Sequence, residues 1–587
     1  MCGARHGRGE APGARARRRK ALTAALAVGT FALALVGCGG ASGEGDGAKT
    51  DATGTTNAVA GRPVEGGTAL IALVQEPGGM NALFHNQSAP LGLAVWVQEP
   101  LFLGRTDGTW EPLLAAEVPT VENGGVTEDG LKVTYRLRPD VTWSDGEPFT
   151  AEDLEFTYDV IRNPKSTTIA PTEYNLVRAV RVVDPQTVEV TMKRPNPYYL
   201  GLFRQTLPKH KFRSSAVTTE DPQARLPLGT GPFTYTNWET GNKIVLERNE
   251  AYWRSDRRPK LDGITLRVTP DAQTAINSFT RGEYDSVFFI TAGDMPTLRS
   301  AQESGAAIEV SPREGSHVEW LWLNQSDKGS DRPHRVLGDP AIREAIDLAI
   351  DRQQIVDEVL DGLGTLTGAF VYSGFARVDR PAAPFDPERA NELLDAAGWV
   401  RGDDGIRVKD GVRASLRFQT LSGDQTRELY QQVIQQNLEE VGIEVKIQNL
   451  PSNLIFGTYD EGGRLARGDY DIVMSREGLA RDPIEGGWAA MFTCAEVPGP
   501  DNKNGTSYVH WCNEEFDRLV GRAASTLDVE ERKDLYEQAV ELFATERPAL
   551  PLYSSTSGYT WSTRMKGVDV DWWDGMWPSA ADWWLER

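Results

Sequence analysis

The sequence predicts an exported α/β protein that divides into two or more lobes. Strand and helix patterns alternate along the whole chain, as they do in α/β folds. About 525 residues follow an N-terminal stretch rich in Gly, Ala, Ser and Thr, and they contain no second low-complexity linker or heptad run. A continuous chain of this length normally buries more than one hydrophobic core.

The first 37 residues have the zones of a signal peptide. Basic residues crowd positions 15–20, and an apolar run of 16 residues occupies positions 21–36. A helix needs roughly 20 apolar residues to cross a membrane, so a permanent transmembrane anchor is the weaker interpretation. The run ends in Leu35-Val36-Gly37-Cys38, which resembles the lipobox of bacterial lipoproteins. The resemblance implies that Cys38 carries a lipid and becomes the first residue of the mature protein.

The segment after the signal peptide, residues 38–62, predicts a disordered tether because it is rich in small and polar residues. Removal of residues 1–37, which hold seven basic residues and one acidic residue, changes the formal net charge from −22 to −28. Nucleic acid is therefore not an expected partner, because its phosphates would be repelled. The charge favours solubility and, weakly, cationic solutes.

The first clear strand is expected over residues 132–137, where apolar and polar side chains alternate. A turn at Asp145-Gly146 follows it. Thr150 and Asp153 then form a variant capping box, with Asp where Glu or Gln is usual. A helix is therefore expected to begin at Ala151.

Two further helices are expected in the second half of the chain. Asp339 and Pro340 supply an N-cap and an N1 proline for a helix that runs through Leu360 and ends at Gly362. A later helix is expected to stop at Gly442 and to lead into a strand over residues 443–447. The apolar row expected to be buried on that helix is Leu429, Val433, Leu438 and Val441.

Two of the four cysteines remain after the signal peptide and the lipidation site are set aside. Cys494 and Cys512 form an even pair in an oxidising compartment and predict a disulfide. Two unpaired buried thiols are the alternative. A metal site is less expected, because no CxxC or neighbouring pair of histidines completes a tetrahedral set of ligands.

Eight short segments together resemble family 5 of the bacterial solute-binding proteins, the peptide, dipeptide and nickel class. They occur in the family's order and span nearly the whole mature chain. We interpret most of them as fold markers, meaning turns, strand ends and core positions. The segments are Glu99-Pro100-Leu101, 135–153, Leu207-Pro208-Lys209-His210, Gly229-Thr230-Gly231-Pro232-Phe233, 249–253 with Tyr252-Trp253, 341–352, 513–517 and 547–553.

The resemblance implies a two-lobed periplasmic binding protein of cluster C, type II-like, with an additional smaller domain and a discontinuous base lobe. A solute is expected between the lobes, which close over it by a hinge motion, and the crossing strand 318–324 is the expected hinge. The expected domains are the base lobe at 63–105, 226–317 and 553–587, the extra domain at 106–225, and the second ligand-binding lobe at 318–552.

A loop from Ser475 to Trp488 offers aromatic, anionic and cationic side chains to a solute. Its candidate ligand-binding residues are Glu477, Arg481, Asp482 and Trp488. The resemblance places the family's amine-anchoring aspartate near Leu479, so Glu477 or Asp482 would have to take that role. A solvated loop or a surface ion pair is the alternative for each of these charges.

The crossing strand supplies three further candidates for ligand contact, Trp320, Trp322 and Asn324. The two tryptophans are two residues apart on a strand and so share a face. That face could line the cleft or pack into the core. Five tryptophans near the C-terminus could form a platform for sugar rings, but packing of the last segment is the favoured interpretation.

The resemblance implies a receptor that captures oligopeptides and delivers them to an ABC permease and its ATPases. Oligosaccharides, opines or metal chelates are alternative solutes, and a sensor or adhesin without an importer is an alternative role. An enzyme is poorly supported, because no GxSxG or HExxH motif is present and the six histidines occur singly. We expect no cofactor and no metal, and a monomer held by its lipid on the outer face of the cytoplasmic membrane.

Overall fold

The computed structural model describes residues 62–85, 87–169, 172–288, 290–371, 374–478, 482–483, 489–573 and 575–587. The expected signal peptide, Cys38 and nearly all of the expected tether lie outside these ranges. Arg481 and Trp488 lie outside them as well. Within these ranges, no helix combines the length and the apolar character that a membrane crossing requires.

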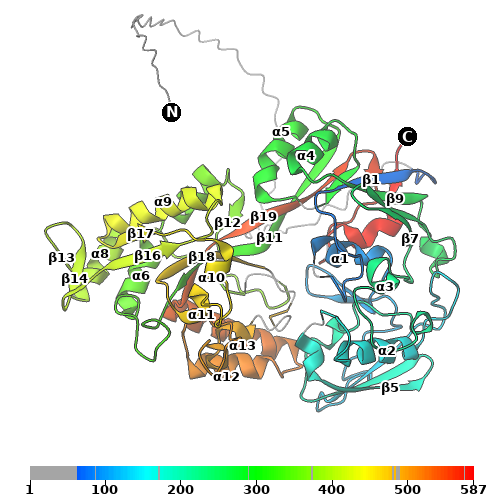
Figure 1. The fold of residues 1–587 in the computed structure, drawn as a ribbon, viewed down its shortest axis with the longest axis horizontal. Helices are drawn as coiled ribbons and strands as arrows, with labels where there is room; N and C mark the ends of the chain where they lie inside the picture. Colours follow the sequence, from blue (N-terminus) through cyan, green and yellow to red (C-terminus); the bar gives the residue numbers. More distant parts are fainter. Residues whose placement is uncertain are drawn as a thin grey trace, which may run out of the picture. The chain divides into compact units, whose positions relative to one another are not determined.

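A central mixed sheet organises the described part of the chain (Figure 1). It has 11 strands, and β12 (Gly364–Thr365) pairs with β19 beside the main path. The order along that path is β17 (Glu444–Ile447), β16 (Ser415–Gln419), β18 (Ile472–Gly478), β11 (Ile308–Leu323), β19 (Ala549–Ser562), β10 (Ser286–Phe288), β1 (Thr68–Leu73), β9 (Gly263–Val268), β8 (Lys243–Arg248) and β7 (Phe233–Glu239).

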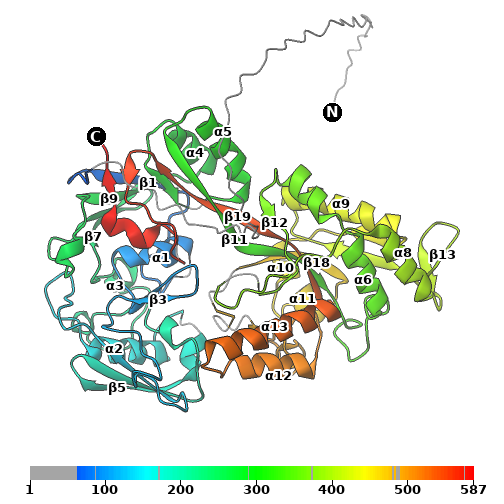
Figure 2. The ribbon, with the colours of Figure 1, turned by 180° about the vertical axis from the view of Figure 1, so that it is seen from behind.

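The strands β11 and β19 connect the two lobes (Figure 2). They pair antiparallel from Ile308 opposite Ser562 to Trp322 opposite Ala549, and their register shifts twice, between Arg313 and His317 and between Glu319 and Trp320. The first shift precedes the predicted hinge, residues 318–324, and the second lies within it. Its strand residues pair with both β18 and β19. The crossing strand is therefore irregular both just before the predicted hinge segment and within it.

The base lobe packs α1 (Ser88–Leu93), α4 (Ala272–Thr280) and α5 (Met295–Glu303) with the β10-to-β7 half of the sheet. Its core includes three indoles in edge contact, with Trp96 5.7 Å from Trp577 and 5.8 Å from Trp583 between ring centroids. Trp583 is fully buried. The C-terminal tryptophans therefore pack the last segment onto the lobe, as the favoured interpretation held.

The extra domain is built on a three-stranded sheet of β4 (Lys132–Arg136), β6 (Thr187–Met192) and β5 (Val177–Asp184). The helix α2 (Ala151–Arg162) packs against it. The predicted start of this helix is confirmed, because the side chains of Thr150 and Asp153 complete the capping box. Asp153 also accepts a hydrogen bond from the Trp143 indole at 3.2 Å.

Three of the family-like segments meet at one buried carboxylate, Glu99. Tyr252 Oη donates to it at 2.6 Å, Trp253 Nε1 at 2.8 Å and Thr230 Oγ1 at 3.0 Å. Desolvation raises the pKa of the Glu99 carboxyl to about 7, although these hydrogen bonds act to lower it. The network ties the chain at Glu99 to the Gly-Thr-Gly-Pro loop and to the Tyr-Trp pair, which supports their interpretation as fold markers.

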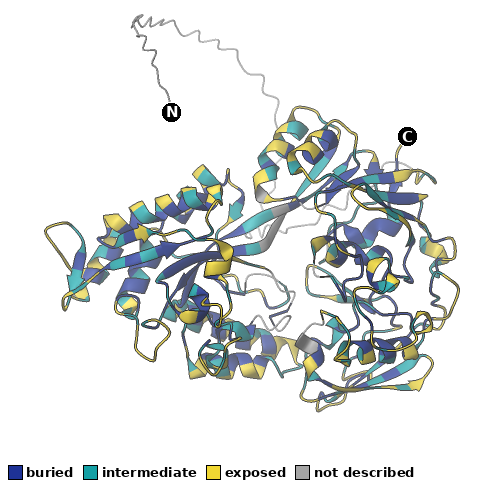
Figure 3. Ribbon diagram, viewed as in Figure 1, coloured by how far each residue is buried: buried dark blue, intermediate teal, exposed yellow. Residues whose placement is uncertain are grey.

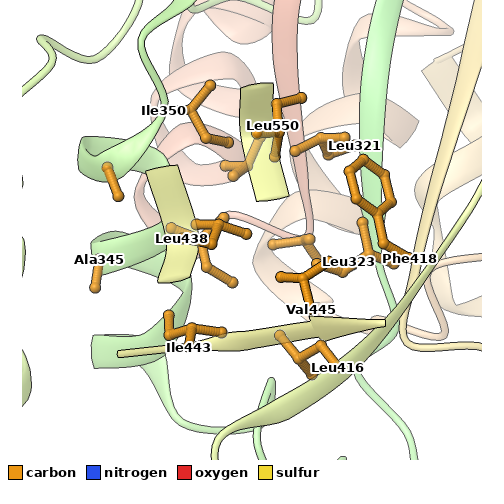
Figure 4. Packing of buried hydrophobic residues seen from close by; sticks show 14 of the residues in the cluster. Leu321, Leu323, Ala345, Ile350, Leu416, Phe418, Leu438, Ile443, Val445 and Leu550 are labelled. Atoms are coloured by element: carbon orange, nitrogen blue, oxygen red, sulfur yellow. The ribbon is translucent and has the colours of Figure 1, made fainter. Parts of the chain in front are cut away.

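The second lobe packs α6 (Pro340–Ala349), α8 (Pro387–Ala396) and α9 (Gln425–Glu440) against its half of the sheet. Figure 4 shows side chains of the strands, including Leu321, Leu416 and Val445, gathered with Leu438 of α9. Figure 3 shows these strands as mostly buried. The predicted row of α9 is confirmed at Leu438 and Val441, which are buried, and at Val433, which packs partly buried on the same core, but Leu429 is 56% exposed.

The helix predicted from Pro340 through Leu360 is wrong in its extent. It ends at Ala349, and Ile350 has an extended backbone. Asp351 then caps a new start, α7 (Arg352–Gln354), which continues into one π-helical turn, Ile355–Val359. The break turns the Arg352 guanidinium inward, where its Nε donates to the Pro551 carbonyl at 3.0 Å. The apolar residues keep their helical spacing across this break, so the spacing in the sequence did not reveal it.

The helices α12 (Glu514–Ala523) and α13 (Val529–Glu546) pack against each other in the same lobe. The predicted disulfide is confirmed, because Cys494 and Cys512 are joined and close a loop before α12. Other short strands and α-helices are β2 (Phe102–Gly104), β3 (Trp110–Pro112), α3 (Pro222–Arg225), β13 (Val400–Arg401), β14 (Arg407–Lys409), β15 (Val412–Arg413), α10 (Ser452–Ile455), α11 (Arg464–Arg467), β20 (Met565–Lys566) and β21 (Trp584–Leu585).

Candidate functional site

The end of β18 presents an open strand edge. One side of β18 pairs with β11 as far as Gly478, but β16 pairs on the other side only at Ile472 and Val473. Along residues 475–478 no strand of the described ranges covers this second edge. Ser475 is buried, whereas Arg476 and Gly478 are exposed. The backbone groups of this edge can therefore pair with an added extended chain.

A buried ion pair supports one face of this strand end. Arg427 on α9 donates two hydrogen bonds, of 2.8 and 3.1 Å, to the carboxylate of Glu319 on β11. Glu319 is 1% exposed and Arg427 6%. Arg476, opposite Glu319 across the ladder, adds a cation at 3.6 Å. The pair fixes α9 to the two strands and holds the charge of Glu319 in a paired state.

The other face of the strand end carries Glu477, one of the predicted ligand residues. Glu477 is half-buried and lies opposite Val318 on β11. Burial raises the pKa of its carboxyl to about 7, and the nearby charge of Glu319 adds to the shift. Burial also lowers the pKa of His317 to about 4, and Arg476 and Arg427 add to that shift. Glu477 therefore changes its ionisation near neutral pH, while His317 stays neutral there.

The prediction that Trp320 and Trp322 line the cleft does not agree with their positions. Their side chains are 1% and 2% exposed and pack against Phe492, with centroid distances of 6.3 and 6.0 Å. Both faces of this part of the sheet are covered, so a shared face of the strand is a core face here. The indoles thus offer no surface to a solute in this conformation.

Asn324 is likewise structural. It is fully buried, and its amide donates to the carbonyls of Gly468 and Tyr470, at 2.8 Å each. Its carbonyl oxygen accepts from the Ser326 backbone at 3.1 Å. The side chain therefore stabilises the turn after β11, and its hydrogen bonds are made to other parts of the protein rather than to a solute.

Asp482 also has a partner within the protein, the buried Arg532 on α13. Its carboxylate lies 3.1 Å from the Arg532 guanidinium, and both residues are 5% exposed. The Arg532 guanidinium also stacks on the Phe375 ring at 4.0 Å. An amine of a solute would have to compete with this ion pair for Asp482. Of the two predicted amine anchors, Glu477 is therefore the one that the geometry favours.

A cavity of about 130 Å³ brings together residues of the two lobes and of the extra domain. Arg105, Trp110 and Tyr198 line it from the side of the base lobe and extra domain, and Phe375 and Arg532 line it from the second lobe. Asp482 and Trp573 also lie on its wall. A second cavity, of about 260 Å³, lies in the second lobe beside β12 and is lined by Thr365, Thr367, Arg377, Arg380 and Ser554 among others.

Sequence reasoning missed the partners that give these charges their roles. Arg532 was not singled out, because it lies 50 residues beyond Asp482 in an ordinary amphipathic helix. Arg427 was missed because its partner, Glu319, lies 108 residues away on another element. In the described ranges, no group of His, Cys, Asp and Glu residues is arranged to hold a metal ion.

Comparison with known proteins identifies relatives over most of the chain. The model of the bacterial extracellular solute-binding proteins, family 5 middle, matches residues 109–498. The oligopeptide-binding protein AppA of Bacillus subtilis (strain 168) is 26% identical over 548 residues, which cover 92% of this chain and 94% of AppA.

Solved structures agree with the fold. The structure of B. subtilis AppA in complex with a nonapeptide matches with a TM-score of 0.65 at 23% identity, covering 90% of this chain and 100% of that chain. The structure of NikA from Brucella suis in complex with Fe(III)-EDTA matches with a TM-score of 0.71 at 24% identity, covering 88% and 100%. The fold class expected from the sequence is confirmed.

Proposed function

Because the chain belongs to family 5 of the bacterial extracellular solute-binding proteins, we propose that it captures oligopeptides between its lobes and delivers them to an ABC importer. The role is binding and release without catalysis. The partners are a permease and its ATPases. The relative AppA, which is named an oligopeptide-binding protein, supports the choice of peptide among the solutes considered.

The observation that carries the peptide proposal is the open edge of β18. An extended peptide can pair its backbone with residues 475–478 as an added strand, which gives affinity without regard to sequence. Glu477 on this strand end would take the peptide's amine. Side chains of the peptide would project alternately to the two sides of the added strand.

The proposal includes the arrangement of the chain outside the cell. A lipid on Cys38 would hold the mature protein on the outer face of the cytoplasmic membrane, as a monomer on the tether of residues 38–62.

The domain bounds expected from the sequence are retained in the proposal. Hydrophobic clusters support them except at the edges, where Leu101 and Phe102 pack with the extra domain and Tyr553 packs with the second lobe.

The direct test is native mass spectrometry of the chain expressed without residues 1–37 and with Cys38→Ser. We expect a ladder of short-peptide masses that travels with the purified protein. A matched sample unfolded, dialysed and refolded should lack these masses and regain them from a peptide mixture. A single sugar or chelate mass in their place would contradict the peptide proposal while leaving the receptor role intact.

The affinity for a peptide with a free amine is expected to depend on pH through Glu477. Its pKa of about 7 means that the carboxylate fraction rises about fivefold between pH 6 and pH 7, while a peptide amine is still mostly protonated. Calorimetric titration with tetra-alanine should therefore show affinity rising about fivefold over this interval.

Two controls isolate the contribution of Glu477. N-acetyl tetra-alanine has no cationic amine, so its affinity should change little between pH 6 and pH 7. Glu477→Gln should weaken tetra-alanine binding and remove the pH dependence. An unchanged pH profile in Glu477→Gln would show that another group anchors the amine.

A further inference from the structure

The cavity of about 130 Å³ is closed by contacts between the extra domain and the second lobe. Leu527, in the turn between α12 and α13, packs against the hydrophobic cluster of the extra domain. Arg194 Nη1 donates to the Ala524 carbonyl at 3.3 Å. Gly108, at a φ of +87°, approaches Phe375 so closely that a Cβ would lie 2.7 Å from its side chain. The cavity therefore exists only while these two parts of the chain are together.

Aromatic rings dominate the wall of this cavity. Trp110, Tyr198, Phe375 and Trp573 line it, and Trp110 and Tyr198 meet edge to face at 6.3 Å between centroids. Two cations lie on the wall, and both are paired: Arg105 with Glu111 and Asp569, and Arg532 with Asp482. Because both charges have partners, the wall does not require a charged group, and its rings favour an aromatic one through edge-to-face contacts.

The size of the cavity matches one ring. An apolar protein cavity of about 150 Å³ binds benzene, so about 130 Å³ accommodates a single phenyl group and excludes a larger assembly of rings. A methyl group would leave most of this volume empty. The volume and the lining residues of the cavity thus both favour a single aromatic ring.

We propose that this cavity is a specificity subsite that takes one aromatic side chain of the solute. The inference rests on the proposed peptide-binding role and deepens it, because it names the class of peptide that the protein prefers. A ring in this position contacts the extra domain and the second lobe at once. Its binding therefore also favours the conformation in which the two are in contact.

The first measurement compares pentapeptides on the intact mature chain by isothermal titration calorimetry. The set is penta-alanine and five variants, each with phenylalanine at one position. At least one variant should bind about tenfold more tightly than penta-alanine, as expected for burial of one phenyl ring. The variant that does so also reports which position of the peptide reaches the cavity.

A cavity-filling variant tests the location of the preference. Val529 lies on the cavity wall and is 47% exposed, so Val529→Trp can fill the cavity from its rim without entering a core. It should reduce the preference for phenylalanine to less than about threefold. The matched control is Val183→Trp on β5, where the valine is 50% exposed and does not line the cavity. It should keep the full preference.

A second probe keeps the subsite and the peptide role separable. N-acetyl-L-phenylalanine amide and N-acetyl-L-alanine amide are compared by saturation-transfer NMR on the same three proteins. The phenylalanine probe alone should give a signal, and Val529→Trp should abolish it. If pentapeptides bind without any preference for phenylalanine, the subsite is wrong and the peptide role stands. If no pentapeptide binds but the phenylalanine probe gives its Val529-dependent signal, the peptide role is wrong and the subsite stands. If neither probe binds, both proposals are overturned.

Discussion

Arg427→Met is expected to lower the free energy of unfolding by about 3 to 5 kcal/mol, because it leaves the Glu319 carboxylate buried without its main partner. Glu319 is 1% exposed, and the two hydrogen bonds from Arg427 are its closest ionic contacts, with Arg476 farther away at 3.6 Å. Urea unfolding followed by tryptophan fluorescence measures the loss. Trp320 and Trp322, on the same strand as Glu319, report on this part of the protein.

The control for this prediction is a pair of the same chemistry at the surface. Arg136 and Glu117 are both roughly half exposed, so Arg136→Met should hardly move the unfolding midpoint. The double variant Glu319→Leu with Arg427→Met should recover most of the loss, since no buried charge remains. An Arg427→Met protein as stable as the Arg136→Met protein would mean that the pair of Arg427 and Glu319 does not stabilise the fold.

Glu99→Leu is expected to cost about 3 to 9 kcal/mol, because three buried or half-buried donors lose their shared acceptor at about 1 to 3 kcal/mol each. The donors are Thr230 in one segment of the chain and the adjacent Tyr252 and Trp253 in another. Glu99→Gln keeps an acceptor and nearly the same volume, so it should cost much less. Equal losses in the two variants would point to packing rather than to the hydrogen bonds.

The same carboxyl predicts a pH dependence of stability. Its pKa is about 7 in the folded protein and near 4.5 when unfolded, so between these values the folded state holds a proton that the unfolded state lacks. The contribution to stability is thus fully present below pH 4.5 and is lost as pH rises to 7, by about 3 kcal/mol. The difference in unfolding free energy between wild type and Glu99→Gln, measured at pH 4.5, 6 and 7.5, isolates this term.

The elements that sequence predicted well are those fixed by neighbours in the chain. The start of α2 depends on Thr150 and Asp153, three residues apart, and both were readable. The two cysteines were also readable, because the expected compartment left them one partner each. Local signals of this kind do not require knowledge of the tertiary arrangement.

The residues that sequence misjudged depend on distant parts of the chain. Alternation along β11 revealed that Trp320 and Trp322 share a face, but not that this face is covered by Phe492 and other side chains of the lobe. The role of Asp482 was decided by Arg532, which comes from another element. Burial and ion pairing of this kind depend on the tertiary fold. The sequence alone therefore could not decide whether these side chains bind a solute or stabilise the protein.

The two crossing strands also determine when the protein can finish folding. Residues of β11 and β19 contribute to the cores of both lobes, with Ile308 in one and Leu321 and Leu550 in the other. Since β19 begins only at Ala549 and lies between β11 and β10, the base lobe lacks an inner strand until the segment that forms the second lobe has been synthesised. The base lobe therefore cannot complete its sheet from its own N-terminal segments alone.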